Sequence, residues 1–316
     1  MRKTLSWIAG IAGAIVLASG AAAQQAPKRD ATIGIVTLQM RAPYFVAMVR
    51  ALEAEGAKRG FKTVVADGGG DAAKVSSDIE DLLARGVDGL IMNISPLESL
   101  PGPMAAIKKA GKPVVLVNRK LTGGEYDAWV GVDNRVIGTG VGEVIAKHMG
   151  GKGVLMMMRG GPEDNSTGNA RRDGVLSKVK DTGIQLLMAP EFGKWTEDGG
   201  IRVMEDMLAK HKQINVVFCE NDSMCLGAQK AIADAKRTGE ISVVGFDGQK
   251  SAIEQIVMGT NYIGSGQNSP SVIARIGVER MAALLAGQKV EKDTITPVVV
   301  ITKENAASLL DPNSPF

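Results

Sequence analysis

The sequence has 316 residues, and its 37 lysines and arginines nearly balance its 34 aspartates and glutamates. The formal net charge of +3, without a long basic run, excludes the charge pattern that is typical of nucleic-acid-binding proteins. The length exceeds what one hydrophobic core usually organises, so we expect two domains.

The chain begins with the pattern of a secretory signal peptide over residues 1–23. Arg2 and Lys3 precede a mostly apolar run at residues 5–18, and Ala23 ends three alanines that suit a cleavage site. The run is shorter than the roughly 20 apolar residues of a membrane span, and no cysteine lies nearby for a lipid anchor. Cleavage near Ala23 removes two basic residues and no acidic residue, which lowers the net charge to +1. We therefore expect a soluble mature chain in the periplasm.

Apolar strand-like runs alternate with amphipathic helical patterns after the signal peptide. Strands recur about every 25 to 30 residues, the period of βαβ units in a parallel sheet. The first series predicts strands at 31–38, 62–66, 90–92, 114–117 and 129–132, and helices at 44–58, 71–85 and 103–109. The second series predicts strands at 154–158, 184–188 and near 216, 242 and 262, and helices at 135–149, 168–180, 198–210 and 224–235.

A helix at 269–285 and a strand at 298–302 follow the second series, and we interpret them as the chain crossing back between lobes. Two successive α/β series predict the α/β fold class with two similar lobes, each with its own parallel sheet. The ligand site would then lie between the lobes.

Polar side chains follow two apolar strands of the second series. Asn221 and Asp222 come after the run 216–218, and Asp247 ends the next strand. Ordinary helix caps and turns explain such residues in most proteins. Ligands of open α/β sheets, however, bind outside the carboxyl ends of the strands, so these residues are also candidates for a site.

The same position, just after a strand, holds a set of aromatic and polar residues. Aromatic rings among amide, carboxylate and guanidinium groups suit a molecule with apolar C–H faces and a rim of hydroxyls, which is a sugar or polyol. Each residue alone has a plain structural explanation, and it is their joint position that favours a site. The candidate ligand-binding residues are Tyr44, Phe45, Asn93, Asn118, Arg119, Arg171, Trp195, Asn221, Asp247 and Gln267.

Cys219 and Cys225 are the only cysteines. In an oxidising compartment they could pair, since a strand end and a first helical turn can come close. Cysteine is also a small buried hydrophobe, and both have apolar neighbours, so we favour two separate buried thiols. Their spacing and the absence of a nearby histidine make a metal site unfavourable. We expect neither a metal nor another cofactor.

An enzyme is the first alternative to a binding protein. The glycines of Gly138–Gly142 faintly resemble a dinucleotide loop, but they lie in an expected helix, where packing explains them better. The turn Asp67–Asp71 suits the entry to a capped helix better than an ion site. Neither His148 nor His211 lies near a candidate nucleophile, and paired carboxylates for glycoside hydrolysis are not evident. Loss of substrate in an assay would favour an enzyme, and unchanged sugar a binder.

Six short motifs, in order, resemble the ribose-binding-protein type of periplasmic solute-binding protein, and the similarity runs over about residues 31–302. The set is more specific than any one member. The motifs are Ala-Pro-Tyr-Phe (42–45), Leu-Ala-Arg-Gly-Val-Asp-Gly-Leu-Ile (83–91), Val-Asn-Arg (117–119), Val-Asp-Asn (132–134), Glu-Asn-Asp-Ser-Met (220–224) and Val-Gly-Phe-Asp-Gly (244–248).

The resemblance implies two Rossmann-like lobes joined by a three-segment hinge and closing on a sugar. The expected N-terminal lobe comprises residues 29–132 and 267–292, and the C-terminal lobe residues 133–266 and 293–316. It implies a monomer that passes a sugar or polyol to an ABC permease in the inner membrane. The resemblance assigns sugar contacts to the candidate residues above, with Asn118 in the place of a usual aspartate.

Other departures from the ribose pattern put ribose itself in doubt. Leu38 and Ala42 stand where a serine and an asparagine are expected, and Trp195 replaces a phenylalanine. Another pentose or hexose, a neutral polyol and a sugar acid remain open. A chemoreceptor partner or a receptor for a furanosyl signal fits the same fold. A LacI-type repressor would instead need an amino-terminal helix-turn-helix, where this chain has an export signal.

Overall fold

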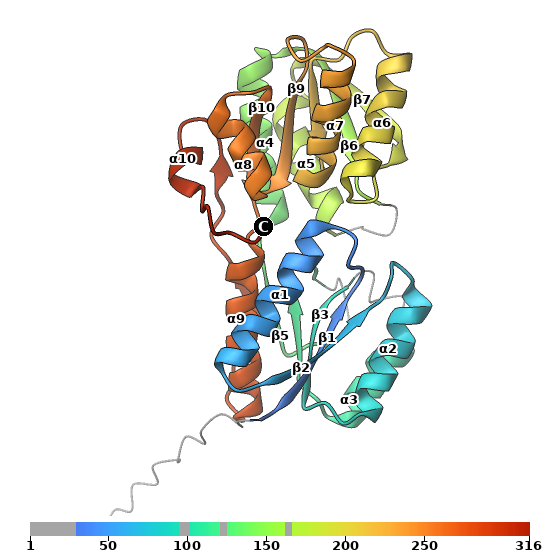
Figure 1. Cartoon of the computed structure of the whole chain (residues 1–316), viewed down its shortest axis with the longest axis vertical. Coiled ribbons are helices and arrows are strands. Elements are labelled where there is room, and N and C mark those ends of the chain that lie inside the picture. Colours follow the sequence, from blue (N-terminus) through green and yellow to red (C-terminus); the bar gives the residue numbers. More distant parts are fainter. Residues whose placement is uncertain (1–29, 95–100, 121–124, 162–165) are drawn as a thin grey trace, which may run out of the picture.

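The computed structural model describes residues 30–94, 101–120, 125–161 and 166–316. The expected signal peptide lies outside these residues. The described chain forms two lobes, one above the other in Figure 1, and each contains a six-stranded sheet. The predicted α/β architecture with two lobes is therefore confirmed.

The first lobe alternates strands and helices along the chain. Its sheet has the order β11-β5-β4-β3-β1-β2, and each of its strand pairs is parallel. Both faces of the four inner strands are buried, which explains the continuous apolar runs in these strands. The elements are β1 (Thr32–Thr37), α1 (Pro43–Lys58), β2 (Lys62–Asp67), α2 (Ala72–Ala84), β3 (Gly89–Asn93), α3 (Pro101–Ala110), β4 (Val114–Val117), β5 (Ala128–Gly131), α9 (Pro270–Leu285) and β11 (Asp293–Ile295).

The second lobe repeats this design with the order β12-β10-β9-β8-β6-β7, in which only β12 is antiparallel to its neighbour. One core lies between the sheet and α4 and α5, and another between the sheet and α6, α7 and α8. The elements are α4 (Asn134–Met149), β6 (Lys152–Arg159), α5 (Thr167–Val179), β7 (Gly183–Phe192), α6 (Glu197–Lys210), β8 (Val216–Cys219), α7 (Asp222–Asp234), β9 (Ser242–Asp247), α8 (Lys250–Met258), β10 (Tyr262–Gln267), β12 (Val300–Ile301) and α10 (Ala306–Leu309).

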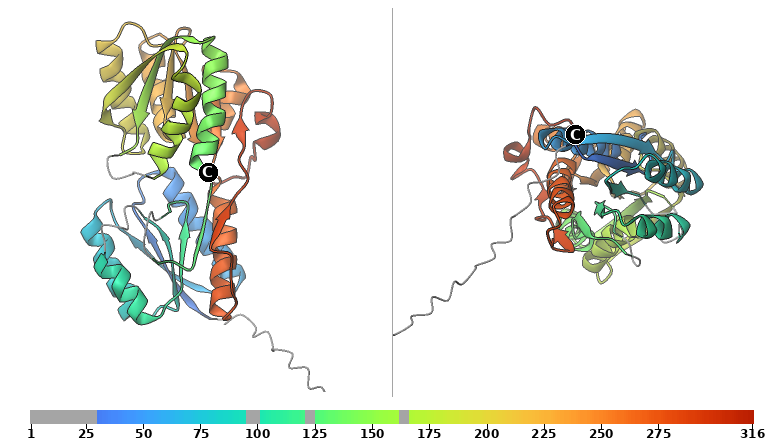
Figure 2. Two further views of the ribbon diagram at one scale, coloured as in Figure 1. Left: turned by 180° about the vertical axis from the view of Figure 1, so that it is seen from behind. Right: turned by 90° about the horizontal axis from the view of Figure 1, so that it is seen from below.

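The described chain crosses between the lobes after β5, after β10 and after β11. Backbone bonds tie neighbouring crossings together, since Thr296 N donates to Gly131 O and Gln267 N donates to Val299 O, each at 2.8 Å. Figure 2 shows from behind that the green α4 and the red α9 lie on the same side of the molecule, where these crossings run.

The third crossing lies further along the chain than the predicted boundary between residues 292 and 293. Asp293 pairs with Trp129 and Ile295 with Gly131, so β11 belongs to the first sheet. Pro297 lies two residues after the end of β11, and because proline lacks an N–H it cannot continue a strand ladder. The strand expected at 298–302 is correspondingly short and covers only Val300–Ile301.

Two glycine-rich segments have the structural roles that the sequence indicated. Gly138 and Gly142 let α4 approach α5 closely, because an added Cβ atom would clash with backbone atoms of Arg171 and Val175. Asp71 caps α2, with its Oδ1 accepting from Ala73 N at 2.7 Å. Helix packing and helix capping therefore explain these segments.

None of the described helices is long and apolar enough to cross a lipid bilayer.

Candidate functional site

The loops at the carboxyl ends of both sheets meet between the lobes around a small cavity. Its volume is about 20 Å³, room for about one water molecule. The lobes are therefore closed on each other. The described residues that line the cavity are Ala42, Tyr44, Phe45, Asn118 and Arg119 from the first lobe, Thr167, Arg171, Trp195, Asn221 and Asp247 from the second, and Asn268 from a crossing.

Most of the predicted site residues lie at this cavity, and Asn93 and Gln267 are the two that do not line it. Asn93 supports the site from behind, because its Oδ1 accepts from Asn118 Nδ2 at 3.2 Å. Gln267 lines a neighbouring cavity of about 210 Å³, which shares Asp247 with the first. The structure thus brings eight of the ten predicted residues together.

Two aromatic rings from different lobes enclose the guanidinium group of Arg119. The guanidinium carbon lies 5.6 Å from the ring centroid of Phe45 on α1 and 5.5 Å from that of Trp195 in the loop before α6. These distances are those of cation–π contacts. Gly160 makes the indole position possible, since any Cβ atom there would overlap the Trp195 ring.

A buried polar network forms the other wall of the cavity. Arg171 on α5 donates from Nη2 to Asp247 Oδ1 at 2.8 Å and from Nη1 to the carbonyl of Glu220 at 2.6 Å. Asn268 Nδ2 donates to Asn118 Oδ1 at 3.0 Å, and so links the crossing to the first lobe. The network holds amide, guanidinium and carboxylate groups in fixed positions around one point.

Burial sets the electrostatics of the site. Burial raises the pKa of Asp247, while the neighbouring Arg171 guanidinium acts in the opposite direction. Burial and the Asp247 carboxylate raise the pKa of Tyr44 well above its usual value. Tyr44 therefore stays a neutral hydroxyl that can donate as well as accept a hydrogen bond.

The turn from β8 to α7 positions Asn221. Its Oδ1 accepts from Met224 N at 3.0 Å, which caps α7, and its Nδ2 donates to the Trp195 carbonyl at 3.1 Å. Asn221 is thus both the helix cap and a residue of the cavity wall.

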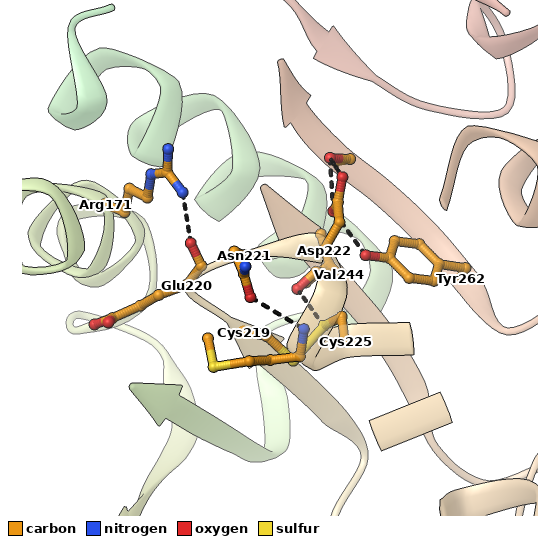
Figure 3. The surroundings of a disulfide bond; sticks show 10 residues. Arg171, Cys219, Glu220, Asn221, Asp222, Cys225, Val244 and Tyr262 are labelled. Carbon is orange, nitrogen blue, oxygen red and sulfur yellow. Dashed lines mark hydrogen bonds between the residues drawn. A yellow bond between two sulfur atoms is a disulfide. The ribbon is translucent and has the colours of Figure 1, made fainter. Parts of the chain in front are cut away.

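A disulfide bond between Cys219 and Cys225 spans the same turn, as Figure 3 shows. The preference for two separate thiols is therefore wrong. The strand end and the first helical turn bring the two Cα atoms to 5.4 Å, within the usual range for a disulfide. Both cysteines are buried. Apolar neighbours suit a disulfide as well as a buried thiol, so the apolar neighbours in the sequence could not distinguish a disulfide from two thiols.

Asp222 lies behind the cavity wall, next in sequence to Asn221. Its carboxylate accepts from Tyr262 OH at 2.7 Å and from Ser265 Oγ and Gln249 N at 2.8 Å each (Figure 3). Burial, with a smaller contribution from Asp247, raises its pKa to about 7. Sequence reasoning treated Asp222 as a helix cap or a candidate for the site, and missed this buried cluster.

Asn268 and Thr167 are cavity residues that the sequence did not single out. Asn268 directly follows the predicted Gln267, so a polar residue after β10 was the available signal. Thr167 begins α5, with no comparable signal in its neighbours. Asn268 Oδ1 and Trp195 Nε1 are buried and have no hydrogen-bond partner among the described residues. These atoms can therefore bind a polar ligand without losing an existing bond.

The described residues contain no cluster of histidine, cysteine, aspartate or glutamate suited to a metal ion.

Known proteins are similar in sequence to most of this chain. A family model described as "Periplasmic binding protein domain" matches residues 33–289. The ribose import binding protein RbsB of Bacillus subtilis (strain 168) is 29% identical over 277 residues, covering 88% of this chain and 89% of that protein. The xylitol-binding protein of Mycolicibacterium smegmatis is 26% identical over 300 residues, covering 94% of this chain and 84% of that protein.

Solved structures share the fold. An ABC transporter solute binding protein from Mycobacterium smegmatis with bound glycerol superposes with a TM-score of 0.85 and 28% identity, covering 90% of this chain and 98% of that chain. A galactofuranose binding protein superposes with a TM-score of 0.83 at 22% identity, covering 90% of this chain and 100% of that chain. The expected fold, that of type I periplasmic binding proteins, is confirmed. These relatives are binding proteins rather than enzymes.

Proposed function

Because the chain belongs to the family of periplasmic binding protein domains, we propose that it captures a monosaccharide or sugar alcohol between its lobes. The protein acts as a monomer and delivers this ligand, chemically unchanged, to an ABC permease in the inner membrane. The observation that carries the proposal is the convergence of aromatic and polar strand-end residues from both lobes on one cavity. The signal-peptide pattern expected at residues 1–23 and the family of periplasmic binding protein domains support a periplasmic location.

The names of the relatives support a hydroxyl-rich ligand. Relatives are named for ribose, xylitol, D-allose and D-apiose, and the structural neighbour with 28% identity holds glycerol. These four relatives are named for import or for binding. This favours transport over a role as a chemoreceptor partner or as a receptor for a furanosyl signal.

Two groups of residues, one apolar and one polar, would recognise different parts of the ligand. Leu38, Ala42, Phe45 and Trp195 belong to one buried apolar cluster that joins the lobes. Asn118, Arg171, Asn221, Asp247 and Asn268 supply polar groups to the lining of the cavity. A ligand with a C–H face and a hydroxyl-rich edge fits this division, because rings stack on C–H groups while amides and charges pair with hydroxyls.

Leu38 and Ala42 also bear on the choice among sugars. They replace hydrogen-bonding residues of the ribose pattern with apolar side chains. A ligand hydroxyl that pointed toward them would lose its partners at a cost of about 1 to 3 kcal/mol. We therefore propose a ligand other than ribose, with no hydroxyl on that side.

A thermal-shift screen of the mature protein tests the proposal. The compounds are pentoses, hexoses, sugar alcohols, inositols and sugar acids. A true ligand at 100 times its Kd adds about 2.7 kcal/mol to the free energy of unfolding, and the melting temperature therefore rises. Calorimetry then gives the affinity, and recovery of the compound unchanged excludes turnover. The proposal fails if no polyhydroxylated compound shifts the transition, or if the bound compound is consumed.

A further inference from the structure

The last residues of the sequence, 310–316, form a connection between the lobes that is additional to the three crossings. We name them the strap. Leu309 and Leu310 pack against the core of the second lobe, whereas Phe316 packs against the core of the first. Figure 1 shows the dark red end of the chain running from α10 to the point marked C, between the lobes and beside α1.

The strap is a stiff turn rather than a loose tail. Ser314 N donates to Asp311 O at 3.1 Å, and Phe316 N donates to Ser314 Oγ at 3.3 Å. Lys250 of α8 donates to the carbonyl of Pro312, which holds the turn to the second lobe. Pro312 and a second proline, Pro315, fix φ at two positions, so ordering the strap costs less conformational entropy than for an ordinary segment.

Phe316 meets a residue of the candidate site. Its ring packs edge to face on Tyr44, with centroids 5.5 Å apart and planes at 88°. Phe45 contacts the same tyrosine ring at 6.1 Å and 87°. Two perpendicular neighbours restrict the rotamers of Tyr44, which lines the ligand cavity.

The strap does not lie flat on the first lobe. It borders the cavity of about 210 Å³ that is also lined by Ala47 and Ala51 of α1 and by Ser269 and Ser271 near the start of α9. Much of the strap is therefore separated from α1 by this space. The aromatic pair of Tyr44 and Phe316 is the contact through which the strap reaches the site.

We propose that Phe316 is a positioning residue for Tyr44, and that residues 310–316 fasten the two lobes in the closed arrangement. The first part rests on the proposed function, because it takes Tyr44 as a sugar contact. A contact between lobes that is made in the closed form raises the fraction of molecules that are closed. A larger closed fraction tightens apparent binding by the same factor.

Phe316→Ala tests the proposal with the sugar that the screen identifies, and with xylitol as a fixed probe. Loss of the ring should raise Kd about 3- to 10-fold, mainly through faster dissociation in stopped-flow measurements. Deletion of residues 311–316 should have at least the same effect. Phe316→Tyr keeps the ring and should bind like the wild type.

Phe61→Ala is the matched control, because Phe61 belongs to the same first-lobe cluster but lies beyond the far end of α1. It should lower stability and leave Kd unchanged. Wild-type affinity and dissociation rate in Phe316→Ala would overturn the positioning role.

A measurement without sugar separates this inference from the proposed function. Spin labels at Glu80 on α2 and Lys230 on α7, both exposed, report the distance between the lobes. Phe316→Ala should shift the distance distribution of the sugar-free protein toward longer values. An unchanged distribution overturns the fastening role, whereas failure of the wild type to bind any sugar overturns the proposed function and leaves the distance test valid.

Discussion

Asp247 has a φ of 106°, a backbone conformation that residues with a side chain rarely adopt. Asn118 and Trp195 also lie at positive φ, at 61° and 64°. All three line the cavity between the lobes. Such conformations cost about 1 to 3 kcal/mol each and persist only where the surroundings impose them. Here the strained backbone at three strand ends places an amide, an indole and a carboxylate in the lining of the cavity.

Trp195→Ala should weaken sugar binding by about 1 to 3 kcal/mol, because it removes the second-lobe aromatic surface of the cavity. Isothermal calorimetry with the sugar found in the screen measures the change. Trp129→Phe is the control, since Trp129 lies in the core of the first lobe. Unchanged affinity in Trp195→Ala would remove the indole from the site.

Asp247→Asn should lower the free energy of unfolding by about 3 kcal/mol, because it leaves the buried Arg171 charge without its carboxylate partner. Urea denaturation at neutral pH measures the loss. The control pair is Asp81 and Arg85, which are exposed and one helical turn apart. Asp81→Asn should change stability by less than about 1 kcal/mol. Equal effects in the two variants would contradict a strong buried pair.

Asp222 should make stability depend on pH. Its pKa is raised to about 7 in the folded protein, so the folded chain binds a proton between about pH 4 and pH 7 that the unfolded chain does not. The stabilisation from Asp222 is therefore complete below about pH 4 and is lost as the pH rises through 7.

Urea denaturation of the wild type and Asp222→Asn from pH 4 to pH 8 isolates this contribution. The difference in unfolding free energy, wild type minus variant, should fall as the pH rises. The neighbours that face Asp222 are Tyr262, Ser265, Gln249 and the Asp247 carboxylate, and they are the same in both proteins. A difference that is constant with pH would show that Asp222 keeps an ordinary pKa.

At the scale of elements, the turn from β8 to α7 combines a helix cap, a wall of the site and a covalent bond. The disulfide closes a short loop, for which chain entropy predicts a stabilisation of about 2 kcal/mol. Cys219→Ala with Cys225→Ala should lose about this amount in urea denaturation. Reductant should destabilise the wild type and leave the double variant unaffected. Equal sensitivity to reductant in both would contradict a disulfide in the native protein.

The sequence predicted the strands that are buried on both faces. It was a poorer guide to which side chains at the strand ends point into the cavity. The strands β1, β3, β4 and β8 read as apolar runs, and the structure confirms them. Asn93 and Gln267 were correctly placed near strand ends. Successive side chains of a strand, however, point to opposite faces of the sheet, so a shift of one residue decides whether a side chain enters the cavity. Gln267 lies beside it, while Asn268 enters.

The boundary of β11 shows a second limit. Asp-Thr-Ile at residues 293–295 carries no apolar run that marks it as a strand. Its position is set by hydrogen bonds to β5, which is more than 160 residues earlier in the chain. Local patterns contain no information on such a distant partner.

At the scale of the whole molecule, the lobes are closed, and apolar residues of the first lobe pack in the same cluster as the second-lobe core. The cavity of about 20 Å³ is too small for a monosaccharide, so entry requires the lobes to separate. The three crossings leave hinge closure as the available motion.

Small-angle X-ray scattering should detect this motion. Saturating sugar should reduce the radius of gyration of the mature protein toward that of the closed structure. Asp247→Ala, which lacks the carboxylate that we propose as a partner of the ligand, should show no reduction at the same concentration. A radius that is the same with and without sugar in the wild type would contradict closure on binding.

The placement of Trp195 has one more consequence. Two indoles lie within the described residues, and one of them sits in the first-lobe core while the other lies between the lobes, near a guanidinium group. Indole emission responds to the polarity and charge around the ring. The molecule thus carries its own optical reporter, and its intrinsic fluorescence should signal each capture event without any added dye.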